Sequence, residues 1–268
     1  MESYEELLSR LKDIELIGQI GSLLSWDQEV LMPPNAAPIR AEQLAWISKT
    51  AHERLTDPKI GNLLDEVGSR DNLSKVELAN LRLARQSYER ATKLPTEFVE
   101  EMAMHKSKSL ISWTEAREKD DFSIFREDLS VSIDHARRKA DFLGYEELRY
   151  DALLDLYESG LTVDTLDPLF SGLRDKVAPL IKAVSEGASR PDLSWVEDNS
   201  WKQESQEALS QSISEAIGFN FSSGRRDRST HPFCGGPNPD DVRWTTRYNE
   251  SEPFGSLFGS MHETGHGT

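Results

Sequence analysis

Helical periodicity dominates most of the chain. From the N-terminus to about residue 217, apolar residues recur every three or four positions, which predicts one amphipathic helix after another. Capping boxes at residues 3–6 and 74–77 mark two of the helix starts, and Gly218 is suited to end the last helix of the series. Pro179 interrupts a segment with helical periodicity, which predicts a kink or a split at that point.

The pattern changes after Gly218. Residues 219–221 form a short β-like run, and glycines and prolines between Pro232 and Pro239 predict a loop. Residues 241–248 are rich in threonine, valine and aromatic side chains, as in a strand. Pro253 then suits the first turn of a final helix. The buried stripe of that helix is predicted from its large apolar residues, which are Phe254, Leu257, Phe258 and Met261.

These elements predict a mainly α fold, with a helical array in residues 1–218 and a small β-hairpin or sheet in residues 219–268. The segment 188–195 is the only plausible linker, and it is short. No repeat of fixed period and no segment of low complexity is evident. We therefore expect residues 1–268 to belong to one domain rather than two.

The chain is strongly acidic, with 47 Asp and Glu residues against 31 Lys and Arg residues and a net charge of -16. A negative surface repels phosphate backbones and anionic membranes, so nucleic-acid and membrane partners are not expected. Cys234 is the only cysteine, which excludes an intramolecular disulfide and favours a reducing compartment. The first residues lack the basic start and apolar run of a signal peptide, so we expect a soluble, cytoplasmic protein.

The last eight residues contain the strongest chemical motif of the chain, His-Glu-x-x-His at residues 262–266. On a helix, His262 and His266 lie on the same face, about 6 Å apart along the axis. That spacing allows two neutral imidazoles to bind one Zn²⁺, while Glu263 acts on water at the metal. The alternative is a solvated helix on which two histidines happen to repeat at helical spacing.

Other candidate residues precede this motif. The strand at 241–248 could pair with an extended peptide and lay its scissile carbonyl over the metal, or it could be a plain structural hairpin. Arg243 and Arg247 could hold a substrate carboxylate, although strand arginines often pair only with neighbouring acids. His231 taken alone is more often a hydrogen-bonded loop residue than a ligand. Cys234 has no neighbouring pattern typical of a nucleophile, which indicates a structural thiol.

Several motifs together resemble the Taq-type thermostable metallocarboxypeptidases, a family of helical zincins. The motifs that carry the resemblance are His231-Pro232-Phe233, the Asp-x-Arg-x-Thr run of Asp241, Arg243 and Thr245, and His262-Glu263-x-x-His266. Residues 25–29, 32–34 and 150–155 are also similar to that family. The resemblance implies a helical, zincin-like, saddle-shaped fold with a deep groove, and release of single residues from the C-termini of peptide substrates.

The resemblance also implies roles for individual residues. His262 and His266 are expected to be ligands of a metal ion, usually Zn²⁺ and sometimes Co²⁺, and Glu263 is expected to be the catalytic carboxylate. The substrate site is expected to be lined or supported by His231, Asp241, Arg243 and Thr245.

In that family a glutamate downstream of the motif is the third metal ligand, whereas this sequence stops two residues after His266. We therefore expect an N-terminal portion of the enzyme, whose metal site lacks its third protein ligand. Apolar surface left exposed would favour a homodimer. Two other functions stay open from the sequence, namely a helical zinc endopeptidase or oligopeptidase and a non-catalytic helical interaction module.

Overall fold

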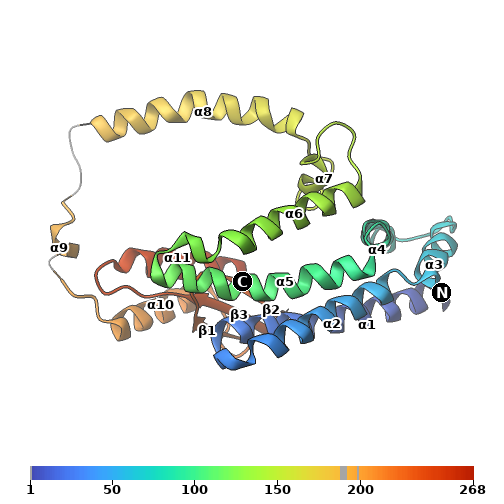
Figure 1. The fold of residues 1–268 in the computed structure, drawn as a ribbon, viewed down its shortest axis with the longest axis horizontal. Coiled ribbons are helices and arrows are strands. Elements are labelled where there is room, and N and C mark those ends of the chain that lie inside the picture. Colours follow the sequence, from blue (N-terminus) through green and yellow to red (C-terminus); the bar gives the residue numbers. More distant parts are fainter. Residues whose placement is uncertain (1, 188–191, 198) are drawn as a thin grey trace. The chain divides into compact units, whose positions relative to one another are not determined.

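A computed structural model describes residues 2–187, 192–197 and 199–268 of the chain. Its elements in chain order are α1 (Glu2–Val30), η1 (Pro34–Ala36), α2 (Ala37–Leu55), α3 (Pro58–Gly68), α4 (Lys75–Thr92), α5 (Thr96–Lys119), η2 (Phe122–Ile124), α6 (Arg126–Leu143), α7 (Asp151–Leu154), α8 (Val163–Glu186), α9 (Ser194–Glu197), α10 (Gln203–Ile217), β1 (Gly224–Arg228), β2 (Cys234–Asn238), β3 (Asp241–Thr246) and α11 (Pro253–His266) (Figure 1). The mainly α fold, with a small sheet before the last helix, is confirmed.

The chain divides into two compact units, one of Met1–Leu129 with Val196–Thr268 and one of Ser130–Trp195. The first unit holds the sheet and the His-Glu-x-x-His helix, so it contains all the candidate site residues. The expected linker at 188–195 includes residues 188–191, which lie outside the described residues.

One core of the first unit lies between α1, α3 and α4. Its fully buried residues are Leu7, Ile60, Leu63, Leu64 and Val67. Four of the five belong to α3, at the spacing that places them on a single helix face. The Asp57 side chain caps α3 by accepting a hydrogen bond from the backbone N–H of Lys59 at 2.8 Å. A short amphipathic helix thus joins the start of α1 to α4.

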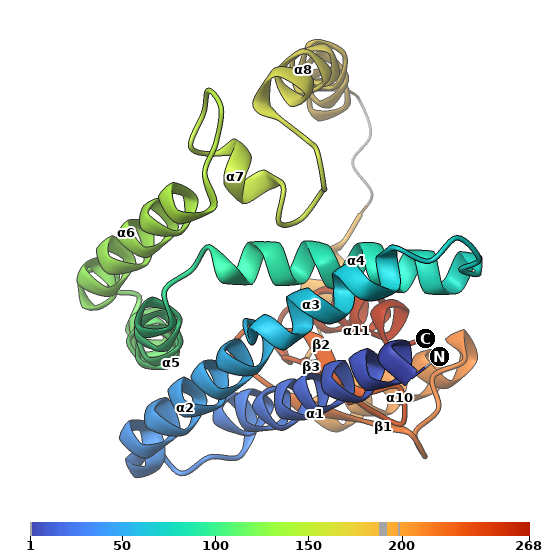
Figure 2. The ribbon, with the colours of Figure 1, turned by 90° about the vertical axis from the view of Figure 1, so that its right-hand side faces the viewer.

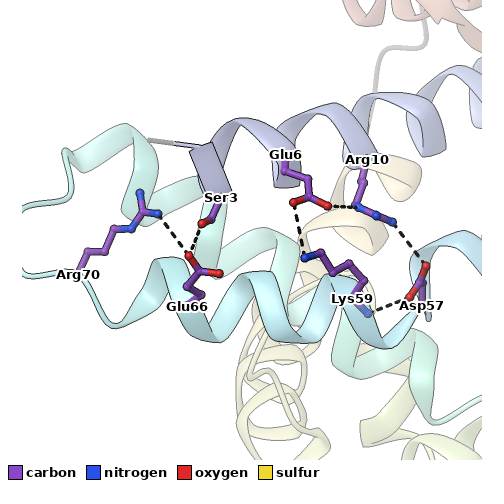
Figure 3. A network of polar contacts seen from close by, with 7 residues as sticks. All are labelled: Ser3, Glu6, Arg10, Asp57, Lys59, Glu66 and Arg70. Carbon is purple, nitrogen blue, oxygen red and sulfur yellow. Dashed lines mark hydrogen bonds and ion pairs between the residues drawn. The ribbon is translucent and has the colours of Figure 1, made fainter.

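A polar network on the surface also joins α1 to α3 (Figure 3). It comprises Ser3, Glu6, Arg10, Asp57, Lys59, Glu66 and Arg70. The expected capping box at residues 3–6 is wrong, because α1 already begins at Glu2 and the Ser3 hydroxyl donates to Glu66 instead. The box at residues 74–77 is confirmed, with both reciprocal hydrogen bonds present at the start of α4.

Side-chain contacts to neighbouring helices fix the second half of α1. Arg40 of α2 donates to the Asp27 carboxylate and to the carbonyl oxygen of Leu24, both at 2.6 Å. Gln28 and Ser107 of α5 exchange two hydrogen bonds of 2.9 and 2.8 Å. Figure 2 shows α1 beside α2. These contacts hold the segment 25–29 in place, and α1 also packs next to β2.

The three strands form one sheet in the order β1-β3-β2, in which β1 is parallel and β2 antiparallel to β3. The predicted strand at 241–248 is confirmed as β3 but ends at Thr246. The β-like run at 219–221 precedes β1 and is not a strand. Phe219 is instead buried edge-on against Trp244 of β3, with ring centroids 6.1 Å apart. Burial of its ring therefore explains the apolar character of this run.

Strand β2 corrects the prediction of a loop between Pro232 and Pro239. Although residues Cys234–Asn238 include two glycines and a proline, they form a strand that pairs with β3 in an irregular register. Gly236 has a φ of 135°, and a Cβ at this position would collide with the carbonyl oxygen of Asp241. Glycine is therefore required for the close approach of β2 to β3, although its presence suggested a loop.

In the second unit, α8 runs unbroken from Val163 to Glu186 with Pro168 and Pro179 inside it. The chain therefore does not split at Pro179. An apolar stripe is exposed along α8, formed by Leu169, Phe170, Leu173, Val177, Leu180, Ile181 and Val184. Within the described ranges, no helix combines the length and apolar character needed to cross a membrane.

His52 of α2 is a buried titratable side chain that contacts the segment before α5. Its side chain is only 8% exposed, and its Nε2 lies 3.0 Å from the carbonyl oxygen of Leu94. Burial lowers the pKa of His52 from its ordinary value of 6.5, while the hydrogen bond to Leu94 and the charge of Glu53 act in the opposite direction. Folding thus favours the neutral form of this imidazole.

We therefore predict that His52 contributes to acid sensitivity. As the pH falls below about 6.5, the unfolded chain takes up a proton at this residue more readily than the folded chain, so the free energy of unfolding decreases. His52→Gln retains an N–H donor for Leu94 but cannot titrate. Urea denaturation at pH 7 and pH 5 should show a smaller loss of stability in this variant than in the wild type. An equal loss in both proteins would contradict the prediction.

Candidate metal centre

Helix α11 carries the His-Glu-x-x-His motif and has defined ends. Glu252 caps its start by accepting from the backbone N–H of Gly255 at 3.1 Å, and Pro253 occupies the first turn, as predicted. The helix ends at His266, and Gly267 follows it. A Cβ at residue 267 would lie 2.9 Å from the Phe219 ring, so a glycine allows the helix end to dock there.

The two imidazoles converge. The Nε2 atoms of His262 and His266 are 3.2 Å apart, and the ring planes are inclined by 83°. Two nitrogen ligands held about 2.0–2.1 Å from a tetrahedral zinc ion lie roughly 3.3–3.4 Å from each other. The observed separation is close to that value, so the pair fits one metal ion. Helical spacing alone places two histidines on one face, but it does not require their Nε2 atoms to face the same point. The observed convergence therefore favours a metal site over a chance repeat of histidines.

A pocket of about 740 Å³ opens between β2 and α11. It is lined by Phe233, Cys234, Gly235, Gly236, Asn238, Pro239, Val242, His262, Glu263, His266, Gly267 and Thr268. Both imidazoles are exposed to solvent, whereas Glu263 is only 7% exposed. The pocket therefore brings a buried carboxylate and two accessible imidazoles together beside strand β2.

A third ligand does not join this pair. Among the described residues, no group of three or more His, Cys, Asp or Glu side chains is arranged to hold a metal ion. Catalytic zinc sites usually have three protein ligands and one open position. The described part of the chain offers two converging imidazoles, with Glu263 between them in sequence.

The buried face of α11 differs from the prediction. Phe258 and Met261 were expected in a buried stripe, but they are 63% and 44% exposed. The face that is buried instead carries Ser256, Ser260 and Thr264, which pack against α10. Small polar side chains allow the two helices to approach closely, and their hydroxyl groups find partners across the interface. The prediction failed because it counted only apolar residues.

Thr245 holds the loop that leads into β2. It is fully buried, its hydroxyl lies 2.6 Å from that of Ser229, and it accepts a hydrogen bond from the backbone N–H of Phe233 at 3.1 Å. The Ser229 hydroxyl also donates to the carbonyl oxygen of His231. Thr245 thus fixes the His-Pro-Phe segment, of which Phe233 lines the pocket. The His231 side chain is exposed beside Trp113 and is not among the pocket residues.

Arg243 is held by two partners. Its guanidinium makes a bidentate pair with Asp241, at 2.8 and 3.0 Å, and lies 4.1 Å from the centroid of the Trp26 ring. Arg225 of β1 lies over the same ring at 5.0 Å. This stack joins α1 to the sheet and explains how the motifs at 25–29 and 241–245 meet. Neither Asp241 nor Arg243 lines the pocket at α11.

The position of β3 also changes the expected substrate contact. β3 is the central strand, so both of its edges are paired and it cannot accept a further strand. β2 is an edge strand, and it lines the pocket beside the two histidines. β2 was not predicted as a strand, because three of its five residues are glycine or proline, which usually mark turns.

Residues 6–268 match the family described as carboxypeptidase Taq (M32) metallopeptidase. The chain belongs to this family. It is 35% identical over 268 residues to carboxypeptidase 1 of Bacillus subtilis, covering 99% of this chain and 53% of that protein. It is also 35% identical to thermostable carboxypeptidase 1 of Thermus thermophilus, covering 98% of this chain and 54% of that protein.

The solved structures agree with the family assignment. The crystal structure of BsuCP superposes on the whole chain with a TM-score of 0.97 at 35% identity, and the match covers 54% of that structure. The resemblance inferred from the three motifs and the zincin-like helical fold are therefore confirmed. The chain spans about half the length of the M32 relatives that it matches.

Cys234 of β2 lies in the pocket near Glu263. Burial raises the pKa of the Cys234 thiol to about 11, and the negative charge of Glu263 adds to the effect. A thiol of this kind is a poor nucleophile at neutral pH because almost none of it is ionised. This agrees with the expected structural role of the only cysteine.

We predict that Cys234 is alkylated slowly by iodoacetamide in the metal-free folded protein. At pH 8 its rate should be about a hundredfold below that of the urea-unfolded chain, because the thiolate fraction falls about tenfold per unit of pKa. Glu263→Gln removes the nearby charge and should accelerate the reaction. Equal rates for folded and unfolded protein, or no effect of Glu263→Gln, would contradict this description of the pocket.

Proposed function

We propose that this chain carries the metal-binding and general-base part of a zinc-dependent carboxypeptidase that releases C-terminal residues from peptides. One observation carries the proposal: the Nε2 atoms of His262 and His266 are 3.2 Å apart, in a pocket that also contains Glu263. Membership of the M32 family supports the same assignment. The metal is proposed as Zn²⁺ because two neutral imidazoles suit it, with Co²⁺ as the substitute.

Three of the pocket residues, His262, Glu263 and His266, have a proposed part in the reaction. Bound by His262 and His266, zinc would supply Lewis-acid chemistry toward the scissile carbonyl and the attacking water. Glu263 takes a proton from that water and returns it to the leaving amine. Because Glu263 is buried, few bulk water molecules reach its carboxylate and compete for that proton. The pair of imidazoles remains accessible to substrate from the pocket.

The edge strand β2 is proposed to bind the peptide. An extended substrate can add to its free edge, so that backbone hydrogen bonds set the register of the peptide relative to the histidines. Thr245 acts indirectly, by fixing the segment that contains His231 and Phe233. Arg243, Asp241 and the buried Trp26 form a brace between α1 and the sheet, so we assign them a supporting role rather than direct substrate contact.

Charge, cysteine content and exposed apolar surface suggest the setting in which the protein works. The net charge of -16 disfavours association with nucleic acids and anionic membranes. A single cysteine suits the reducing cytoplasm. The exposed apolar stripe of α8 would suit a homodimer, which equilibrium sedimentation of the chain would test.

Zinc titration of the chain tests the proposal. Calorimetry should show one Zn²⁺ bound per chain, and His262→Ala should weaken this binding at least about a hundredfold through loss of one of two imidazole ligands. His105→Gln is the matched control, because His105 lies on α5 with its Nε2 bonded to the carbonyl oxygen of Asp128. Equal affinity in the wild type and His262→Ala would exclude the site.

The catalytic assignment is tested on a blocked dipeptide with added zinc. Any release of its C-terminal residue should fall about 10²–10⁴-fold in Glu263→Gln, because proton transfer is lost while both imidazoles remain. Turnover that survives this substitution would contradict the role of Glu263. Cleavage of internal bonds in a peptide with an amidated C-terminus would favour the endopeptidase alternative.

A further inference from the structure

Helices α10 and α11 are joined by three pairs of buried polar side chains. Ser256 donates to Gln206 at 2.5 Å and Ser260 donates to Ser210 at 2.9 Å. The third pair consists of the hydroxyls of Ser214 and Thr264, which are 2.8 Å apart. Successive pairs are four residues apart on both helices, so the helices run in the same direction with matched registers. We refer to these three pairs as the α10–α11 ladder.

The α10–α11 ladder determines both the rotation and the register of α11. All six of its side chains are buried, and a buried hydroxyl that loses its partner costs free energy. The amide of Gln206 is also satisfied by the carbonyl oxygens of Trp201 and Asn249. If α11 turned or slid along α10, several of these groups would lose their hydrogen bonds together. Phe258 and Met261 do not provide this constraint, because both are exposed.

The last pair of the ladder lies inside the motif. Thr264 is located between His262 and His266, in the final turn of α11. Terminal turns are the parts of a helix that open most easily. Convergence of the two imidazoles requires this turn to remain helical, because His266 reaches its position through the i, i+4 spacing. The hydrogen bond to Ser214 is the side-chain contact that ties this turn to α10.

We propose that Ser214 and Thr264 are positioning residues for the metal centre: their hydrogen bond keeps the last turn of α11 closed, so that His262 and His266 converge on one metal ion. This inference rests on the proposed function for its metal. Apparent metal affinity equals the intrinsic affinity multiplied by the fraction of molecules in which the turn is closed. Loss of the hydrogen bond lowers that fraction.

Thr264→Val and Ser214→Ala test the proposal. Valine has nearly the shape of threonine but lacks the hydroxyl, whereas Thr264→Ser keeps the hydroxyl and removes the methyl group. Ser212→Ala is the matched control for Ser214→Ala. Ser212 is exposed on α10, and its hydroxyl donates to the carbonyl oxygen of Ala208 within that helix. Two quantities are measured: hydrogen exchange at the Gly267 amide in the metal-free protein, and Co²⁺ affinity by visible absorption.

The Gly267 amide reports the last turn because it donates to the carbonyl oxygens of Glu263 and Thr264. We expect the equilibrium constant for opening of the last turn to rise about fivefold in Thr264→Val and in Ser214→Ala, so that exchange at this amide accelerates by up to that factor and Co²⁺ affinity falls in proportion to the loss of closed molecules. A fivefold change corresponds to about 1 kcal/mol, the usual contribution of one hydrogen bond. Thr264→Ser and Ser212→Ala should remain near the wild type. The double variant should be little worse than either single variant, because both remove the same bond.

The result that would overturn the proposal is unchanged Gly267 exchange in folded Thr264→Val. Acceleration shared equally by core amides such as that of Leu64 would also overturn it, since the pair would then stabilise the fold without positioning the turn. If the wild-type chain binds no Co²⁺, the proposed function fails. Exchange at Gly267 would still decide whether the pair closes the turn.

Discussion

The buried contact between α10 and α11 is the constraint on which the candidate metal centre depends. A helix that presents two imidazoles to solvent must bury its other side, and here the buried side is polar. Ser260 and Thr264 satisfy their hydroxyls on α10, and Glu263 is buried in the same turn as Thr264. Hydrogen bonds are directional, so this interface fixes the rotation of α11 more closely than an apolar contact of the same size would.

The sheet supplies the other half of the pocket, and its own position depends on α1. Trp26 lies under the guanidinium groups of Arg225 and Arg243, and Arg243 is also paired with Asp241. A ring covered in this way holds two adjacent strands against one helix. Thr245 then fixes the segment before β2. Residues outside the pocket lining thus support the sheet and the segment that leads into its edge strand.

Most of the fold was predictable from sequence because helix formation is encoded locally. Apolar periodicity, the capping box at 74–77 and Gly218 at the end of α10 were the main local signals. Predictions failed where a tertiary contact overrides a local signal. Ser3 bonds to Glu66 rather than capping its own helix, and β2 contains glycines for close packing. At the site, the spacing of His262 and His266 correctly predicted their convergence. The burial of Thr264 could not be predicted in the same way, because it depends on a matching row of small residues on α10, fifty positions away.

The central claim is that both imidazoles of α11 bind one metal ion. X-ray absorption at the zinc edge tests it directly, on the chain loaded with one equivalent of Zn²⁺. The claim predicts two imidazole nitrogens at about 2.0–2.1 Å in the wild type, and one fewer in His266→Ala. An imidazole count that is unchanged by His266→Ala, or a wild-type spectrum without imidazole ligands, would contradict it.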